Sequence, residues 1–73
     1  MRYAIVIERA ASNYSGYVPD LPGCIATGAT VKATEQLLRE AIQLHIDGMN
    51  EDGIAVPRPT SQVDYVDVPL AGE

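Results

Sequence analysis

PDLPGC, residues 19–24, is the stretch of sequence that decides the fold of this chain. Its centre, Leu21-Pro22-Gly23-Cys24, fits a type II turn, because proline suits the second position and glycine supplies the positive φ that the third requires. Pro19 lacks a backbone N–H and helps to end the strand that enters the turn. The chain is therefore predicted to reverse direction here, between two strands of one sheet.

Three short strands are predicted around this turn, over Tyr3–Glu8, Ser15–Pro19 and Cys24–Ala29. They are bounded by turn residues, and the first is rich in β-branched side chains. Gly16, inside the second strand, is expected to mark a β-bulge. Because the connections are short, the strands are expected to pair antiparallel as a three-stranded meander.

A single amphipathic helix is predicted from Val31 to about Asp52, with Thr30 as its N-cap and Gly53 as its C-terminal stop. The core stripe comprises Val31, Leu38, Ala41, Ile42, His45 and Met49, and the polar face comprises Gln36, Arg39, Glu40, Gln43, Asp47 and Glu51. Leu44 lies off the core stripe. An apolar side chain in that place favours an interface with a second subunit.

A fourth strand is predicted over Gln62–Val68, where apolar side chains occur on both alternating faces and Pro69 ends the pattern. It follows an extended connection that contains Pro57. The expected order is β-β-β-α-β, an α/β chain of the α+β type: an antiparallel meander with the helix packed on one sheet face and the last strand parallel to the third. Residues 1–69 are expected to form one domain and residues 70–73 a flexible tail.

The strand predicted over Tyr3–Glu8 carries apolar side chains on both faces. One helix can cover only one sheet face, so the other is expected to meet another subunit or a different protein. Self-association would also compensate for a thin core, since 73 residues without Phe or Trp bury little apolar surface. A homo-oligomer is therefore expected, and both a dimer and a tetramer stay open.

The composition indicates what kind of partner the chain binds and in which cellular compartment it is expected. The formal net charge is -5, which repels phosphate groups and favours a basic partner. The single cysteine, Cys24, cannot form an intrachain disulfide framework and indicates a reducing compartment. The first predicted strand begins almost at Met1, and no secretory leader or membrane-spanning stretch is present. The chain is therefore expected to be cytoplasmic and to bind no membrane.

The sequence contains few residues that could form an active site. Cys24 and His45 are the only thiol and imidazole, and both fit packing positions better than a nucleophile and its base. A nuclease-like carboxylate cluster could draw on Glu8, Asp20, Asp64 and Asp67. Solvation at the ends of strands explains these four better. With no metal-ligand spacing and no glycine-rich phosphate loop, we expect no metal, no cofactor and no catalytic residue.

Several motifs occur in order along the chain: PDLPGC at 19–24, Gly28-x-Thr30 opening the helix, Glu40-Ala41-Ile42 and His45 within it, and Gly53 before Pro57-x-Pro59. In this combination, from Tyr3 to about Val68, the chain resembles the HicB-like antitoxin family. The resemblance implies a truncated RNase H-like fold without the metal-binding carboxylates of true RNase H enzymes. It also implies oligomerisation and binding to HicA, a small basic toxin of double-stranded-RNA-binding-domain fold that cleaves mRNA with a histidine.

Two features depart from the pattern of that family. Many HicB proteins carry a helix-turn-helix or ribbon-helix-helix segment after this domain, and that segment binds operator DNA. Residues 1–73 have no room for one, so no direct DNA binding is expected from this chain. Lys32-Ala33-Thr34 stands where relatives usually have an acidic pair, and a lysine in the first helical turn opposes the helix dipole slightly.

Together, the resemblance and the residue patterns predict a non-enzymatic, antitoxin-like binding module that masks a HicA-type toxin. Candidate partner-binding residues are Tyr17, Asp20, Leu21, Glu40, Asp47 and Glu51. Candidate oligomer contacts are Tyr3, Leu44 and Tyr65. Two rivals stay open: an orphan homo-oligomeric adaptor without a toxin, and a metal-dependent RNase H-like nuclease that would lose activity on replacement of Glu8 or Asp64.

Overall fold

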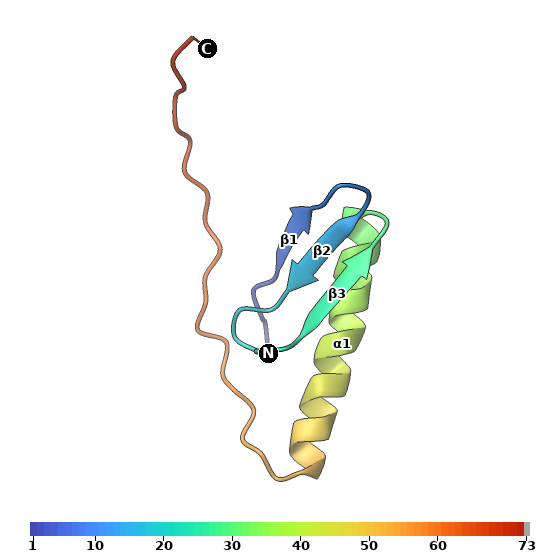
Figure 1. Cartoon of the computed structure of the whole chain (residues 1–73). Helices are drawn as coiled ribbons and strands as arrows, with labels where there is room; N and C mark the ends of the chain where they lie inside the picture. The colour runs from blue at the N-terminus through green and yellow to red at the C-terminus, as the bar shows by residue number, and fades with distance from the viewer. Residues whose placement is uncertain (73) are drawn as a thin grey trace.

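A three-stranded antiparallel sheet and one helix make up the folded body of the chain (Figure 1). The computed structural model describes residues 1–72. Strands β1 (Val6–Arg9), β2 (Tyr14–Tyr17) and β3 (Ile25–Gly28) pair in the order β1-β2-β3, and α1 (Val31–Glu51) lies across one face of the sheet. The α+β class, the meander and the single covering helix are thereby confirmed. Each strand is shorter than predicted, and Tyr3–Ile5 lead into β1 without ladder pairing.

The turn between β2 and β3 has the geometry that its sequence predicts. Gly23 has a φ of 85°, and the Cys24 N–H donates to the Leu21 carbonyl over 3.1 Å. The Val18 N–H donates to the Cys24 carbonyl over 3.2 Å and closes the base of the loop. Positive φ at the third position together with the hydrogen bond from the fourth to the first residue is the type II arrangement.

Gly16 does not mark a bulge, contrary to the prediction. The ladder runs one residue to one through it, with Ile7 and Ala26 as its neighbours on β1 and β3. Its role is to let the helix approach, because a Cβ at Gly16 would lie 2.6 Å from Leu38 Cδ1. Gly28 acts in the same way, since a Cβ there would lie 2.6 Å from Thr34 Oγ1.

Helix α1 begins and ends at the residues that the sequence indicates. Thr30 Oγ1 accepts a hydrogen bond from the Ala33 N–H over 3.0 Å, which confirms the N-cap. Gly53 has a φ of 68°, and the Ile54 N–H turns back to donate to the Met49 carbonyl over 2.8 Å. Among the described residues, no helix has the length and apolar character to cross a membrane.

The core between sheet and helix is small. Its buried hydrophobic residues are Val18, Leu21, Cys24 and Leu38, and half-buried side chains of β1, of the residues that lead into it, of β3 and of α1 pack around them. Leu21 has no exposed surface, so its assignment as a partner-binding residue is wrong: the tight turn directs this side chain into the core. Val31, expected on the core stripe, is 49% exposed because it lies in the first turn of the helix, beyond the cluster.

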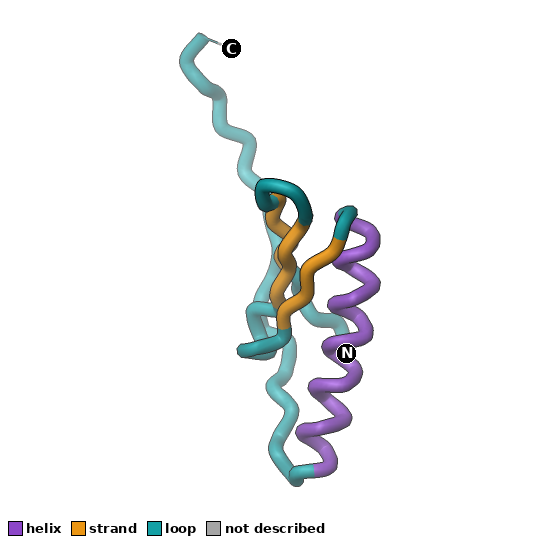
Figure 2. The backbone as a smooth tube through the Cα atoms, turned by 45° about the vertical axis from the view of Figure 1, so that its right-hand side comes forward, coloured by secondary structure: helices purple, strands orange, loops and turns teal. Residues whose placement is uncertain are grey.

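The chain after the helix is extended but forms no strand within residues 54–70. It runs back past the β1 side of the sheet in the direction of β1 and then projects beyond the sheet (Figures 1 and 2). The prediction of a fourth strand over Gln62–Val68 is therefore wrong for the described structure, in which these residues form no strand. The alternation of side chains is present, but a strand also needs a neighbour for its N–H and C=O groups, and this segment has none in the described part of the chain. Of the predicted tail, Glu73 lies outside the described residues.

Candidate partner-binding site

One side of α1 carries exposed leucines between carboxylates. Leu37 is 43% exposed and Leu44 is 74% exposed, and the residues that carry the nearby carboxylates are exposed as well. Spacings of three and four residues bring such side chains to one side of a helix. We call this surface the acid-leucine stripe, and it consists of Leu37, Glu40, Leu44, Asp47 and Glu51.

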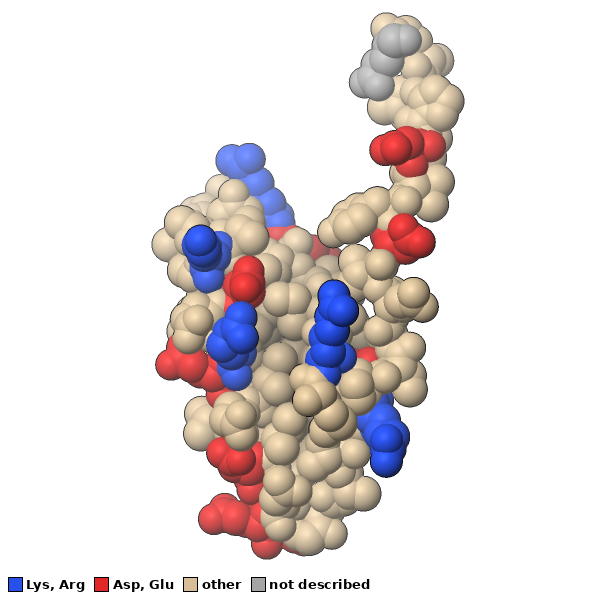
Figure 3. Space-filling model, turned by 180° about the vertical axis from the view of Figure 1, so that it is seen from behind, with Lys and Arg blue, Asp and Glu red and all other residues tan. Residues whose placement is uncertain are grey.

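The stripe is held rigidly because the other side of α1 is anchored in the core. Thr34 and Leu38 are completely buried against the sheet, and Ala41 and Ile42 pack beside them. Several acidic side chains gather at the lower end of one edge of the molecule, and no basic side chain is seen at that end (Figure 3). The helix thus presents its acidic surface without needing to order a loop.

Local contacts leave the stripe's carboxylates available. Gln43 Nε2 donates to Asp47 Oδ1 over 2.9 Å and orients that carboxylate without neutralising it. The one ion pair among the described residues joins Arg39 to Glu35 over 3.5 Å and includes no stripe residue. Both of its side chains are largely exposed, so it adds little to stability.

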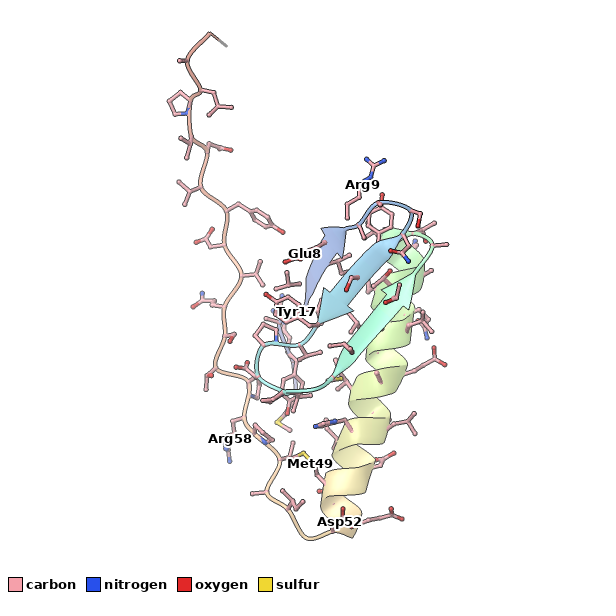
Figure 4. The ribbon with its side chains drawn as sticks, viewed as in Figure 1. Glu8, Arg9, Tyr17, Met49, Asp52 and Arg58 are labelled. Carbon is pink, nitrogen blue, oxygen red and sulfur yellow. The ribbon has the colours of Figure 1, made fainter. Side chains whose placement is uncertain are left out.

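Tyr17 lies on the sheet face that the helix leaves uncovered. Successive strand residues point to opposite faces, and Gly16 faces the helix, so Tyr17 faces outward. Its cross-strand neighbours are Val6 and Ile25, and together they form an apolar row in which Ile25 is 69% exposed. Figure 4 shows the Tyr17 side chain on this uncovered face.

Asp20 uses its carboxylate within the chain. It accepts backbone hydrogen bonds from Thr60 and Ser61, each over 2.9 Å, and hydroxyl hydrogen bonds from the same two residues over 3.1 and 2.8 Å. The hydrogen bonds from Ser61 and then Thr60 hold the pKa of the Asp20 carboxyl below its ordinary value of 3.8. We call these three residues the latch, because they join the β2–β3 loop to the chain that follows the helix.

The predicted contact residues lie on several different surfaces of the structure. Of the partner-binding set, Glu40, Asp47 and Glu51 share the stripe, whereas Tyr17 is on the sheet face and Asp20 is in the latch. The three predicted oligomer contacts lie apart from one another. Tyr3 packs against the core, Leu44 belongs to the stripe, and Tyr65 lies in the C-terminal segment.

Leu37 was missed by sequence reasoning. Its spacing of seven residues from Leu44 is the signal that could have identified it, because seven residues are close to two helical turns.

The chemistry of the remaining candidates favours packing and local structure. Cys24 is buried, and burial raises the pKa of its thiol, which disfavours the reactive thiolate. The four carboxylates considered for a nuclease are spread over β1, the latch and the C-terminal segment. Within residues 1–72, no three His, Cys, Asp or Glu side chains are grouped as metal ligands would be.

Three relatives resemble this chain in sequence. An uncharacterized 14.9 kDa protein from the rep-hol intergenic region of Haemophilus phage HP1 is 38% identical over 69 residues, which cover 94% of this chain and 52% of the phage protein. A UPF0150 protein of Thermoplasma acidophilum is 30% identical over 85% of this chain and 91% of its own length. A UPF0150 protein of Helicobacter pylori is 32% identical over 68% of this chain and 69% of its own length. The chain thus spans about half the length of the phage relative.

A solved structure and a family model agree with the fold described above. A chain of the HicA3 and HicB3 toxin-antitoxin complex superposes with a TM-score of 0.70 at 30% identity, over 82% of this chain and 70% of that chain. The family model described as HicB-like antitoxin of bacterial toxin-antitoxin system matches residues 3–69. Because that match covers nearly the whole chain, this chain belongs to the HicB-like antitoxin family of bacterial toxin-antitoxin systems.

Proposed function

We propose that this chain binds a HicA-type toxin and neutralises it by covering its active region. Family membership and the likeness to a chain of a HicA and HicB complex support a toxin as the partner. The observation that carries the proposal is the acid-leucine stripe, which combines carboxylates and exposed leucines on one rigid helix.

The stripe suits a basic protein for two separate reasons. Its three carboxylates, in a chain of net charge -5, attract a basic partner and orient it during encounter. Leu37 and Leu44 supply apolar surface, and affinity depends on such surface being buried at the centre of an interface. The same negative potential would repel RNA, so the stripe would bind the basic toxin and not the toxin's RNA substrate.

The proposed role is binding without catalysis. Covering a toxin requires no reacting group in this chain, and it would take place in the cytoplasm, where mRNA is the toxin's substrate. We further propose that the chain self-associates, because the apolar row of Val6, Tyr17 and Ile25 faces outward with no helix over it.

The test pairs this chain with a HicA-type toxin, taken from the neighbouring reading frame where that frame encodes one, both in cells and as purified proteins. We expect co-expression of this chain to restore growth that the toxin arrests, and the two proteins to co-purify at near-stoichiometric amounts. Glu40→Lys and Leu44→Ala should each raise the Kd about tenfold or more, because a few central residues dominate an interface. Glu8→Lys, which makes the same charge change on β1, is the matched control and should change the Kd little.

Two results would contradict the proposal. Absence of both the complex and the growth rescue would exclude toxin neutralisation by this chain and favour a homo-oligomeric adaptor. A complex whose Kd responds to Tyr17→Ala, but not to the stripe variants, would move the toxin contact to the outer face of the sheet.

A further inference from the structure

The segment that follows the latch, residues 62–70, is an extended chain that pairs with no strand in the described part of the chain. Its side chains project into open space on both sides (Figure 4). Of its backbone groups, only the Tyr65 N–H has a hydrogen bond among the described residues, to the neighbouring Asp64 carboxylate over 2.8 Å. The Cα trace measures 55 Å in its longest dimension, whereas a 21-residue helix is only about 32 Å long. The segment therefore extends well past the folded body.

The composition of this segment is that of a strand covered on both faces. Tyr65 is 88% exposed on one face, and Val66 and Val68 are 85% and 67% exposed on the other. An isolated extended chain leaves these side chains in water and its N–H and C=O groups unpaired by protein. Addition to the edge of a sheet satisfies both needs at once.

The start of the segment is held in one place. The latch holds Thr60 and Ser61, and the Tyr3 hydroxyl donates to the Pro57 carbonyl over 2.6 Å. Residues 61–63 then lie beside residues 2–5, with an open space between them. The rest of the segment runs apart from the sheet and pairs with none of its strands, so it does not occupy the outer edge of its own β1 (Figure 1).

We propose that residues 62–70 of one copy add as a strand to the free outer edge of β1 in a second copy, and that the exchange is reciprocal about a two-fold axis. This deepens the self-association proposed above and does not depend on the toxin. Each chain then supplies one strand and accepts one. The fourth strand that the sequence predicts is formed between chains.

Charge favours a second copy as the occupant. The segment carries Asp64 and Asp67 and no basic residue. The receiving edge has Arg2 at its entrance and Arg9 at its end, both exposed, although Glu8 lies between them on the outward face. The projecting arm bears only acidic charged groups, whereas the basic groups lie on the body (Figure 3).

The shape of the receiving side agrees with this assignment. The helix packs mainly over β2 and β3 and contacts β1 least. It thereby leaves an open groove of about 600 Å³ between α1 and the N-terminal residues, with Ile5, Leu38 and Ile42 in its lining. The side chains that an added strand directs toward the helix would cover this groove.

Pro69 determines which side of the segment pairs. Backbone groups of alternate residues point to opposite edges of a strand, and proline has no N–H to donate. Odd-numbered residues must therefore point their N–H groups away from β1. The pairing side is formed by the even-numbered residues Asp64, Val66 and Val68.

The test compares two proline variants in the full chain. Light scattering of the eluting protein is expected to give the mass of a dimer for the unaltered chain. Val66→Pro removes an N–H from the pairing side and should raise the dimer Kd about tenfold or more. Asp67→Pro, the adjacent control, removes an outward N–H and should change the Kd less than about threefold relative to Asp67→Ala, which removes the same carboxylate and keeps the N–H. Hydrogen exchange of the β2 and β3 amides verifies that both variants stay folded.

Isotope mixing identifies the chain to which the segment binds. In a mixture of labelled and unlabelled copies, we expect NOEs from the Val66 and Val68 methyls of one copy to β1 residues of the other. NOEs to β1 within the same copy only would overturn the exchange. If the chain is a monomer at all concentrations, the proposed self-association is wrong. If it is a dimer but the two proline variants have equal Kd values, residues 62–70 do not form the dimer contact. Toxin binding is measured separately and is affected by none of these outcomes.

Discussion

At the scale of single residues, Gly28 and Gly48 show that two glycines in one small domain can have opposite effects on stability. A Cβ at Gly28 would meet the Thr34 backbone nitrogen at 2.8 Å, and backbone cannot move aside as the end of a side chain can. A Cβ at Gly48, inside the helix, has nothing within 4 Å. The first glycine is required by packing, and the second weakens the helix through its backbone entropy.

Alanine at these two positions is expected to change stability in opposite directions. Gly28→Ala should lower the free energy of unfolding by about 1–3 kcal/mol, because the helix start must shift away from the sheet. Gly48→Ala should raise it by about 1 kcal/mol, the difference in helix propensity. Urea unfolding followed by circular dichroism measures both. Equal effects of the same sign would show that the close approach at Gly28 does not govern packing.

At the scale of elements, α1 combines a structural face and a binding face. Thr34 and Leu38 are buried against the sheet, while Leu44 on the stripe is 74% exposed. Substitutions on the stripe are therefore expected to change binding with little change in stability. The Thr30 side chain alone caps the N-terminus of the helix, since no acidic residue lies in the first turn to stabilise it further.

Removing that N-cap should destabilise the helix measurably. Thr30→Ala is expected to lower the free energy of unfolding by about 1 kcal/mol, because the Ala33 N–H loses its side-chain acceptor. Thr30→Ser keeps the hydroxyl and should restore most of that loss. Thermal unfolding of the unaltered chain, Thr30→Ala and Thr30→Ser, all at one protein concentration, compares their stabilities. A serine variant as unstable as the alanine variant would assign the effect to the lost methyl group instead.

At the scale of the whole molecule, the latch connects parts of the chain that are 40 residues apart. Asp20 lies in the loop after β2, and Thr60 and Ser61 lie beyond the helix. No ladder pairing secures this segment to the sheet, so side-chain contacts determine where it leaves the body. The strand exchange proposed above depends on that starting point.

The latch is expected to open in acid. Because folding lowers the pKa of Asp20 below 3.8, its contribution is fully present above about pH 3.8 and is lost as the pH falls through the lower, folded value. The Ser61 amide shift should therefore report a midpoint below 3.8 in an NMR titration. The Ala33 amide, which donates to Thr30, is the control for global unfolding. A Ser61 midpoint at or above 3.8 would contradict stabilisation of the ionised carboxylate.

The candidate site was only partly predictable from the sequence. Helical spacing identified Glu40, Asp47 and Glu51 as a polar face, because periodicity along one helix is a local property. Asp20 and Leu21 were grouped together as neighbours in a loop, yet one accepts hydrogen bonds in the latch and the other is buried. Their separation depends on which way each side chain points in the folded turn, and adjacency in sequence does not convey that direction.

The sequence by itself determined the local structure: the turn at Pro22-Gly23, the helix limits at Thr30 and Gly53, and the order of the first three strands and the helix. Each of these depends on the φ preferences and hydrogen-bonding groups of a few adjacent residues. The tertiary structure alone decided that Gly16 accommodates the helix, that Asp20 holds Thr60 and Ser61, and that residues 62–68 pair with no strand in the described part of the chain. Those outcomes depend on distances between segments far apart in the chain, and residue patterns do not specify such distances.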